Sequence, residues 1–158
     1  DILAELGFSY DSSVFPIHHD RYGIPNSPRW PYQLVTSSGS SLIEFPPSTF
    51  AVGSYRLPVA GGGYFRIYPY QLTHFALSRI NRIEGQPFIF YLHPWEIDPE
   101  QPRICAGWLS AFRHYTNLSR CERRLCQLLR DFRFAPARDV LKTLTITKTS
   151  ITELFTGK

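Results

Sequence analysis

The chain has 158 residues, of which 43% are hydrophobic and 19% are charged, and its formal net charge at pH 7 is +4. This length fits one folded domain, and this composition excludes a globally disordered chain. Because no run of 18 apolar residues is free of charge, we expect no membrane-spanning helix.

The positive charge is concentrated late in the chain. Residues 1–102 contain six Arg and nine acidic residues, whereas residues 103–142 contain eight Arg, one Lys and three acidic residues. A basic segment could bind nucleic acid, an anionic glycan or an acidic membrane surface, but charges also cover ordinary solvated helices. Since no nucleic-acid-binding motif accompanies the charge, we expect no nucleic-acid partner.

The three cysteines, Cys105, Cys121 and Cys126, cannot all pair with one another. Their spacing also lacks the Cys-x-x-Cys and Cys/His patterns of zinc sites. We therefore expect reduced, mostly buried thiols, which favour a reducing compartment and a cytoplasmic location.

The first predicted element is a helix at the beginning of the chain. Ile2, Leu3 and Leu6 share one helical face, and Gly7 stands where a left-handed C-cap belongs. Because the chain contains no Met, we expect these residues to be the last turns of a helix that begins before residue 1.

Short strands and a long loop are expected next. Residues 8–13 alternate like a strand, and residues 14–40 are interrupted by four Pro and two Gly, which predicts a loop. Residues 41–45 and 55–59 predict two strands that could form a hairpin, with Pro58 at a sheet edge.

The second half of the chain alternates helices with apolar segments. The expected elements are a helix over 69–83, a doubly buried strand over 87–92, a loop over 97–115, a helix over 117–131, a short strand over 132–134, a helix over 136–141, and a tail over 143–158 that is either an edge strand or disordered. This order predicts an α/β fold.

Two candidate catalytic residues stand at the ends of predicted strands, where α/β folds place active groups. His93 directly follows the most hydrophobic predicted strand, and Asp11 ends the strand after the first helix. If the two side chains lie side by side, His93 would be a proton donor that works near neutral pH. The alternatives are a structural histidine at a strand end and an Asx-turn aspartate.

Two other motifs carry weaker signals. His18, His19 and Asp20 could hold a metal, but consecutive side chains point in different directions, so a loop surface fits them better. The triple glycine at 61–63 lacks the Gly-Lys-Ser/Thr ending of a phosphate loop and instead predicts a tight turn or a close backbone approach.

Six blocks of sequence together resemble one family. They are GFSYDSSVFP (7–16), HDRYGIP (19–25), EFPPST (44–49), GGGYFR (61–66), FYLHPWEID (90–98) and FRHYTNL (112–118). In this order they look like the C-terminal half of NodB-like polysaccharide deacetylases of carbohydrate esterase family four, and most like the subfamily of bacterial exopolysaccharide loci linked to exosortase systems. The resemblance covers about residues 1–142, and the tail 143–158 falls outside it.

The resemblance implies a fold and a reaction. The fold would be the C-terminal part of a distorted, incomplete (β/α) barrel whose N-terminal strands are missing. The reaction would be metal-dependent removal of acetyl groups from N-acetylated sugars of a polysaccharide, with a divalent metal, usually zinc, held by one Asp and two His. His93 matches the family's proton donor and Asp11 the carboxylate that tunes it.

Several expectations follow from this resemblance. The family's Asp-Asp and His-x-x-x-His motifs do not occur in this chain, and its Arg-x-Pro motif is expected before residue 1, so we expect that the chain alone neither holds the metal tightly nor turns over substrate. The residues expected to contact the substrate are Tyr64, Arg66, Trp95, Arg113 and His114; the alternatives are loop anchoring for Arg66, Arg113 and His114 and a core position for Trp95. The alternative function is a non-catalytic carbohydrate-binding or exopolysaccharide-biosynthesis module that uses the aromatic residues of the loops.

Overall fold

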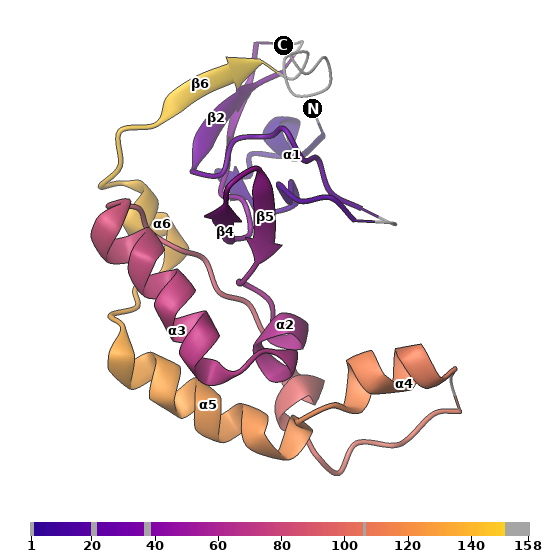
Figure 1. Cartoon of the computed structure of the whole chain (residues 1–158). Helices are drawn as coiled ribbons and strands as arrows, with labels where there is room; N and C mark the ends of the chain where they lie inside the picture. The colour runs from indigo at the N-terminus through magenta and orange to yellow at the C-terminus, as the bar shows by residue number, and fades with distance from the viewer. Residues whose placement is uncertain (1, 20–21, 37–38, 106, 151–158) are drawn as a thin grey trace.

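The structure, a computed structural model, describes residues 2–19, 22–36, 39–105 and 107–150 (Figure 1). The strands are β1 Tyr10–Asp11, β2 Tyr32–Val35, β3 Ser41–Glu44, β4 Thr49–Val52, β5 Tyr55–Pro58 and β6 Thr147–Ser150. The helices are α1 Ile2–Glu5, α2 Gly62–Ile67, α3 Tyr70–Ser78, α4 Trp108–Tyr115, α5 Leu118–Asp131 and α6 Ala137–Leu141, with a π-helical turn η1 Arg79–Ile83 and a 3₁₀ turn η2 Pro94–Ile97.

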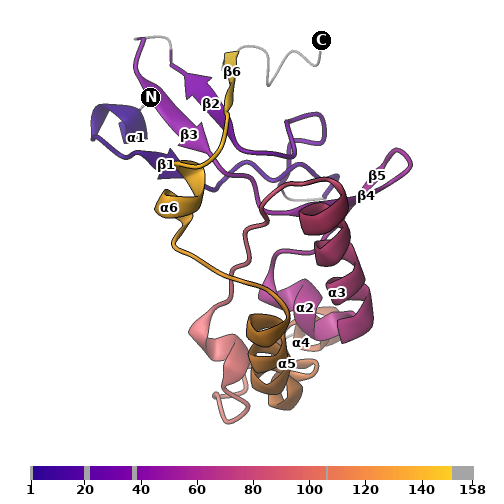
Figure 2. The same cartoon turned by 90° about the vertical axis from the view of Figure 1, so that its left-hand side faces the viewer.

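The strands form a mixed α/β fold with two separate sheets. One sheet has the order β1-β3-β2-β6, in which β2 and β3 are antiparallel and the two outer pairs are parallel; the other is the β4–β5 hairpin. Figure 2 shows the larger sheet at one end of the molecule and helices α2 to α5 at the other. Among the described strands the larger sheet is open at both edges, so the expected barrel is not closed.

Several expected elements are confirmed. Gly7 has a φ of +81° and ends α1. Strands β1, β3 and β5 lie within the segments expected to form them, and α3 with η1, α5 and α6 match the expected helices. Part of the tail forms β6 at the edge of the sheet, whereas residues 151–158 lie outside the described residues.

Other expectations about local structure are wrong. Strand β2 lies within the expected loop 14–40, and helix α4 lies within the expected loop 97–115. The suggested hairpin of 41–45 with 55–59 does not form, because β3 pairs with β2 and β5 pairs with β4. A four-residue strand or an exposed helix carries too few core residues for its periodicity to stand out in the sequence.

The apolar segment 87–92 is not a strand of either sheet. Its one β-bridge among the described residues is an isolated parallel bridge between Gly61 and Tyr91. Its side chains instead pack against the helical core, as do those of the expected strand 132–134, which is irregular. None of residues 87–92 is fully buried, so the expected burial on both faces is wrong as well as the expected strand.

Helices α2, α3 and α5 enclose the main core. Its buried residues are Val59, Phe65, Tyr70, Ala76, Leu77, Ile80, Cys121, Leu128 and Phe132. Full burial of a large apolar side chain contributes about 1.5–3 kcal/mol, so this cluster fixes the helices against each other. In the part of the chain that is described, no helix is both long and apolar enough to cross a membrane.

A buried carboxyl group connects the larger sheet to the loop that follows β1. Glu44 is fully buried and its Oε1 accepts hydrogen bonds from the backbone N–H groups of Ser13 and Val14, at 2.9 and 2.8 Å. Burial, together with the neighbouring charge of Asp11, raises the pKa of Glu44 to about 7, against the opposing effect of these hydrogen bonds. The folded protein therefore holds the Glu44 proton more tightly than the unfolded chain does.

We predict that this group makes the protein less stable as the pH rises from about 4.5 to about 7. Over that range the unfolded chain has released the Glu44 proton and the folded protein has not, so the free energy of unfolding falls by roughly 3 kcal/mol. Urea unfolding of the wild type and of Glu44→Gln, each at about pH 4.5 and about pH 7, measures this fall in the free energy of unfolding. Glu44→Gln should lack the loss of stability that Glu44 causes between these two pH values. An equal loss in the wild type and the variant would contradict the prediction.

Candidate functional site

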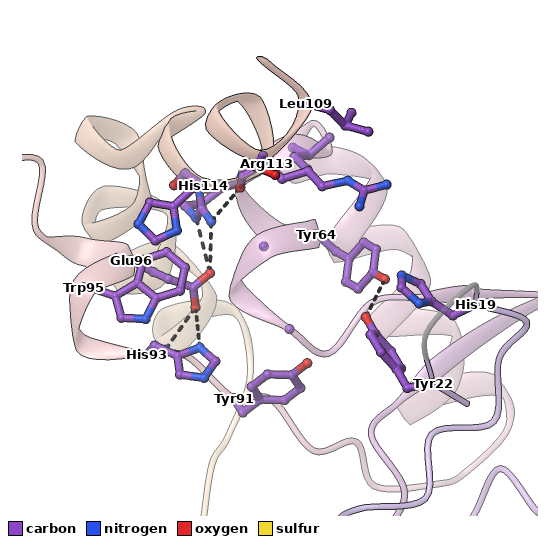
Figure 3. Close-up of a pocket in the computed structure, with 15 residues that line it drawn as sticks. His19, Tyr22, Tyr64, Tyr91, His93, Trp95, Glu96, Leu109, Arg113 and His114 are labelled. Carbon is purple, nitrogen blue, oxygen red and sulfur yellow. Dashed lines mark hydrogen bonds and ion pairs between the residues drawn. The ribbon is translucent and has the colours of Figure 1, made fainter. Parts of the chain in front are cut away.

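A cavity of about 620 Å³ lies among α2, η2, α4 and the loop before β2 (Figure 3). This volume falls within the range of small-molecule binding sites. Its lining brings together residues that are far apart in the sequence, and these include His19, Tyr22, Tyr64, Tyr91, His93, Trp95, Glu96, Leu109, Arg113 and His114.

A buried ion pair forms the floor of this cavity. Arg66 of α2 and Glu96 of η2 are both almost completely buried, and Nη2 and Nε of Arg66 donate to Oε1 of Glu96 at 3.2 and 3.3 Å. A buried charge without its partner is costly, because it loses hydration and gains nothing in return. The pair therefore ties α2 to the segment that carries His93.

The same guanidinium holds the end of α4. Nη1 of Arg66 donates to the carbonyls of His114 and Thr116, both at 2.9 Å, and Nη2 donates to that of Arg113 at 3.1 Å. These are carbonyls of the last helical turn, which lack partners within the helix and carry its partial negative charge. Because all five N–H groups of Arg66 are used within the protein, Arg66 builds the cavity and has no donor left for a ligand.

Two glycines let these elements approach one another. A Cβ atom on Gly62 would lie 2.5 Å from Cδ and 2.7 Å from Oε1 of Glu96, and one on Gly61 would lie 2.7 Å from the Tyr91 hydroxyl. Gly63, by contrast, has no atom within 4 Å of the position of a Cβ. The triple glycine thus serves the close approach expected from the sequence, and Gly62 makes room for the carboxylate.

His93 is held by the same carboxylate and faces the cavity. Oε2 of Glu96 accepts a hydrogen bond from the backbone N–H of His93 at 3.0 Å and lies 3.3 Å from Nδ1 of its ring. The side chain of His93 is 56% exposed, whereas that of Glu96 is 2% exposed. A carboxylate on one ring nitrogen orients the imidazole and leaves the other nitrogen toward a ligand.

Aromatic rings line the wall beside His93. The His93 ring stacks on Trp95 at a centroid distance of 5.5 Å, and Trp95 stacks on His114 at 4.3 Å with planes only 12° apart. Nε2 of His114 lies 2.8 Å from Oε1 of Gln101, which fixes its ring. The three stacked rings form a rigid apolar surface with polar edges.

Tyrosines line the opposite side of the cavity. The hydroxyl groups of Tyr22 and Tyr64 lie 3.4 Å apart, and the ring of His19 stacks on Tyr22 at 3.9 Å. Burial raises the pKa of Tyr64, and its hydrogen bond with Tyr22 raises it further. Burial also raises the pKa of Tyr91. These phenols therefore stay protonated at neutral pH and can both donate and accept hydrogen bonds.

A buried thiol lies close to the ion pair. Burial raises the pKa of Cys121 to about 11, so this thiol is protonated at neutral pH and is not an activated nucleophile. All three cysteines are free, as expected, although Cys105 and Cys126 are exposed rather than buried.

Asp11 does not line the cavity. It lies at the end of β1, paired in register with Glu44 of β3, and the carboxylate that contacts His93 is Glu96. The structure therefore gathers His93 with the five residues expected to contact the substrate, but it does not bring Asp11 to them.

Several lining residues were not expected to contact the substrate, among them Tyr22, Tyr91 and Glu96, and His19 was considered only as a metal ligand. Only Glu96 had a local signal, because a Pro at the first helical position and a Glu three residues after His93 are typical of a helix start. Asp20, of the histidine cluster considered above, lies outside the described residues.

The divalent metal that the family resemblance implies is not matched by these residues. Within residues 2–19, 22–36, 39–105 and 107–150, no three His, Cys, Asp or Glu side chains lie close enough to hold a metal ion. The His93 ring contacts the carboxylate of Glu96, and that carboxylate also pairs with Arg66. No chemical step is therefore assigned to a metal here.

We predict opposite effects for two neighbouring glycines. Gly62→Ala should lower the free energy of unfolding by at least about 2 kcal/mol, because the buried carboxylate of Glu96 has nowhere to move. Gly63→Ala should be neutral or stabilise the protein by up to about 1 kcal/mol, since its site is open and helical. Urea unfolding of both variants tests this, and similar values for the two would contradict it.

Comparison with known proteins gives one match. The model of a family described as "Domain of unknown function (DUF3473)" matches residues 12–142. No curated protein and no solved structure is significantly similar to the chain. The matched segment contains every residue of the cavity, from His19 to His114. This chain therefore belongs to the DUF3473 family.

Proposed function

We propose that this chain supplies the proton donor for hydrolysis of N-acetyl groups on the sugars of a polysaccharide, with His93 as the donor. The observation that carries the proposal is the contact of the His93 ring with the buried carboxylate of Glu96, at the rim of an aromatic cavity. The six sequence blocks that resemble polysaccharide deacetylases support it, and four of the six contribute residues to the cavity lining.

The reaction needs an acid at this position. Water adds to the acetyl carbonyl, the C–N bond then breaks, and acetate and a free sugar amine are formed. An amine leaves only after it has taken up a proton, which Nε2 of His93 would donate as the bond breaks. Positioned acid catalysis of this kind contributes about 10²–10⁴-fold to a rate. The activation of the attacking water is not assigned to the described residues.

Glu96 takes the role that the sequence analysis gave to Asp11. Its carboxylate is fixed by Arg66, so it holds the His93 ring in one orientation and does not itself reach the cavity as a free acid. The proposal thus keeps His93 as the catalytic residue and makes Glu96 a positioning residue. Asp11 instead belongs to the sheet, which we propose to be a segment of a larger (β/α) barrel.

The aromatic wall suits the flat apolar faces of sugar rings. Trp95 and His114 form a stacked surface next to His93, while Tyr64 presents a protonated hydroxyl group across the cavity. Stacking on a rigid ring buries the C–H face of a sugar, and hydroxyl groups satisfy its polar edges. A saccharide bound in this way would present its N-acetyl group to His93.

The test compares His93→Gln with His74→Gln in the natural protein that contains this sequence. His74 is a partly exposed histidine of α3 near Asp131 and outside the cavity lining, so it is a matched control. Release of amine from an N-acetylated oligosaccharide should fall by about 100-fold or more for His93→Gln and should not change for His74→Gln. Affinity for the oligosaccharide should stay within about twofold for both.

Two results would contradict this assignment. If His93→Gln retains full turnover, His93 is not the proton donor. If the wild-type protein binds the oligosaccharide but releases no amine, the site is a non-catalytic carbohydrate-binding site.

A further inference from the structure

Arg113 projects into the cavity, and no described residue pairs with its charge. Its backbone is fixed, because its carbonyl accepts a hydrogen bond from Arg66 at the end of α4. Its side chain is exposed, and among the described residues its guanidinium makes no hydrogen bond or ion pair. Figure 3 shows the guanidinium extending toward the side of the cavity that carries Tyr64 and away from His93.

The charge of Arg113 is not balanced within the cavity. Glu96 is the one carboxylate among the described lining residues, and it is buried and already shared by Arg66 and His93. The surrounding segment adds to the imbalance, since residues 103–142 contain nine basic and three acidic residues. The cavity therefore offers a ligand an unneutralised, permanently charged group with planar geometry.

We propose that the cavity binds an anionic saccharide, and that Arg113 recognises the carboxylate of a hexuronate next to the N-acetylated sugar. This inference rests on the proposed function and specifies its substrate class. A guanidinium matches a carboxylate with two parallel N–H···O bonds, which gives both affinity and orientation. A carboxylate on Arg113 would place the neighbouring sugar between Tyr64 and the stacked rings of Trp95 and His114.

The positions of the polar groups fit two adjacent sugars. His93 and Arg113 point to different parts of one cavity of about 620 Å³, so the reacting group and the anionic group would belong to different sugar rings. The hydroxyl groups of Tyr22 and Tyr64 can donate hydrogen bonds to the oxygen atoms of the saccharide beside the carboxylate.

The test measures binding of a matched pair of oligosaccharides to the 158-residue chain by titration calorimetry. One probe is a tetrasaccharide of alternating N-acetylglucosamine and glucuronate, and the other is the same tetrasaccharide with its carboxyl groups reduced to alcohols. The wild-type chain should bind the carboxylated probe about tenfold more tightly than the reduced probe. Added salt should reduce this preference.

Variants of two arginines test whether Arg113 causes the preference for the carboxylated probe. Arg113→Gln should lose the preference and bind the reduced probe within about twofold of the wild type, which also shows that the variant is folded. Arg120→Gln should keep the preference, because Arg120 is an exposed residue of α5 outside the cavity lining. Arg113→Lys retains the charge without the planar fork and should show an intermediate preference.

The possible failures are distinguishable. If the wild-type chain binds both probes equally, or if Arg113→Gln keeps the preference, the assignment of an anionic saccharide to Arg113 is overturned and the saccharide site remains. If the wild-type chain binds neither probe, the saccharide site itself is overturned, and the proposed function with it.

Discussion

The buried ion pair of Arg66 and Glu96 is the interaction on which the cavity depends. A guanidinium with five N–H groups can join elements that share no strand pairing, and here it joins α2, η2 and the end of α4. A lysine has three donors and no planar fork, so it could not replace this arginine. Desolvation of two charges is costly, and only complete pairing of both groups offsets that cost. The cavity is therefore rigid at its floor and polar at its rim.

One carboxylate thus performs two tasks. Oε1 of Glu96 neutralises Arg66, and Oε2 lies against the backbone N–H and ring of His93. The histidine is consequently oriented by a carboxylate whose side chain is only 2% exposed. Arg113 differs from Arg66 in this respect, because only its backbone is part of the network and its charge remains available. The end of α4 therefore contributes a backbone carbonyl that binds Arg66 and a charged side chain that lines the cavity.

The sequence predicts the long periodic elements well and the contacts between them poorly. Helices α3 and α5 could be predicted because their apolar residues recur at helical spacing and face the core. Helix α4 could not be predicted, because none of its residues is buried. Its end is fixed by hydrogen bonds from Arg66, which is distant in the sequence. His93 was identified as a site residue, but its pairing with Asp11 assumed that segment 87–92 is a strand. It is a half-buried segment that packs against the helical core, and the three-residue spacing of His93 and Glu96 was the better indication of a site.

A double-mutant cycle on Arg66→Met and Glu96→Gln tests the central claim most directly. Each single variant leaves one buried group without its partner, so each should lower the free energy of unfolding by roughly 3–5 kcal/mol. The double variant removes both charges at once and should be destabilised by at least about 2 kcal/mol less than the sum of the two single effects. Additive effects would show that the two side chains do not depend on each other, and would contradict the account.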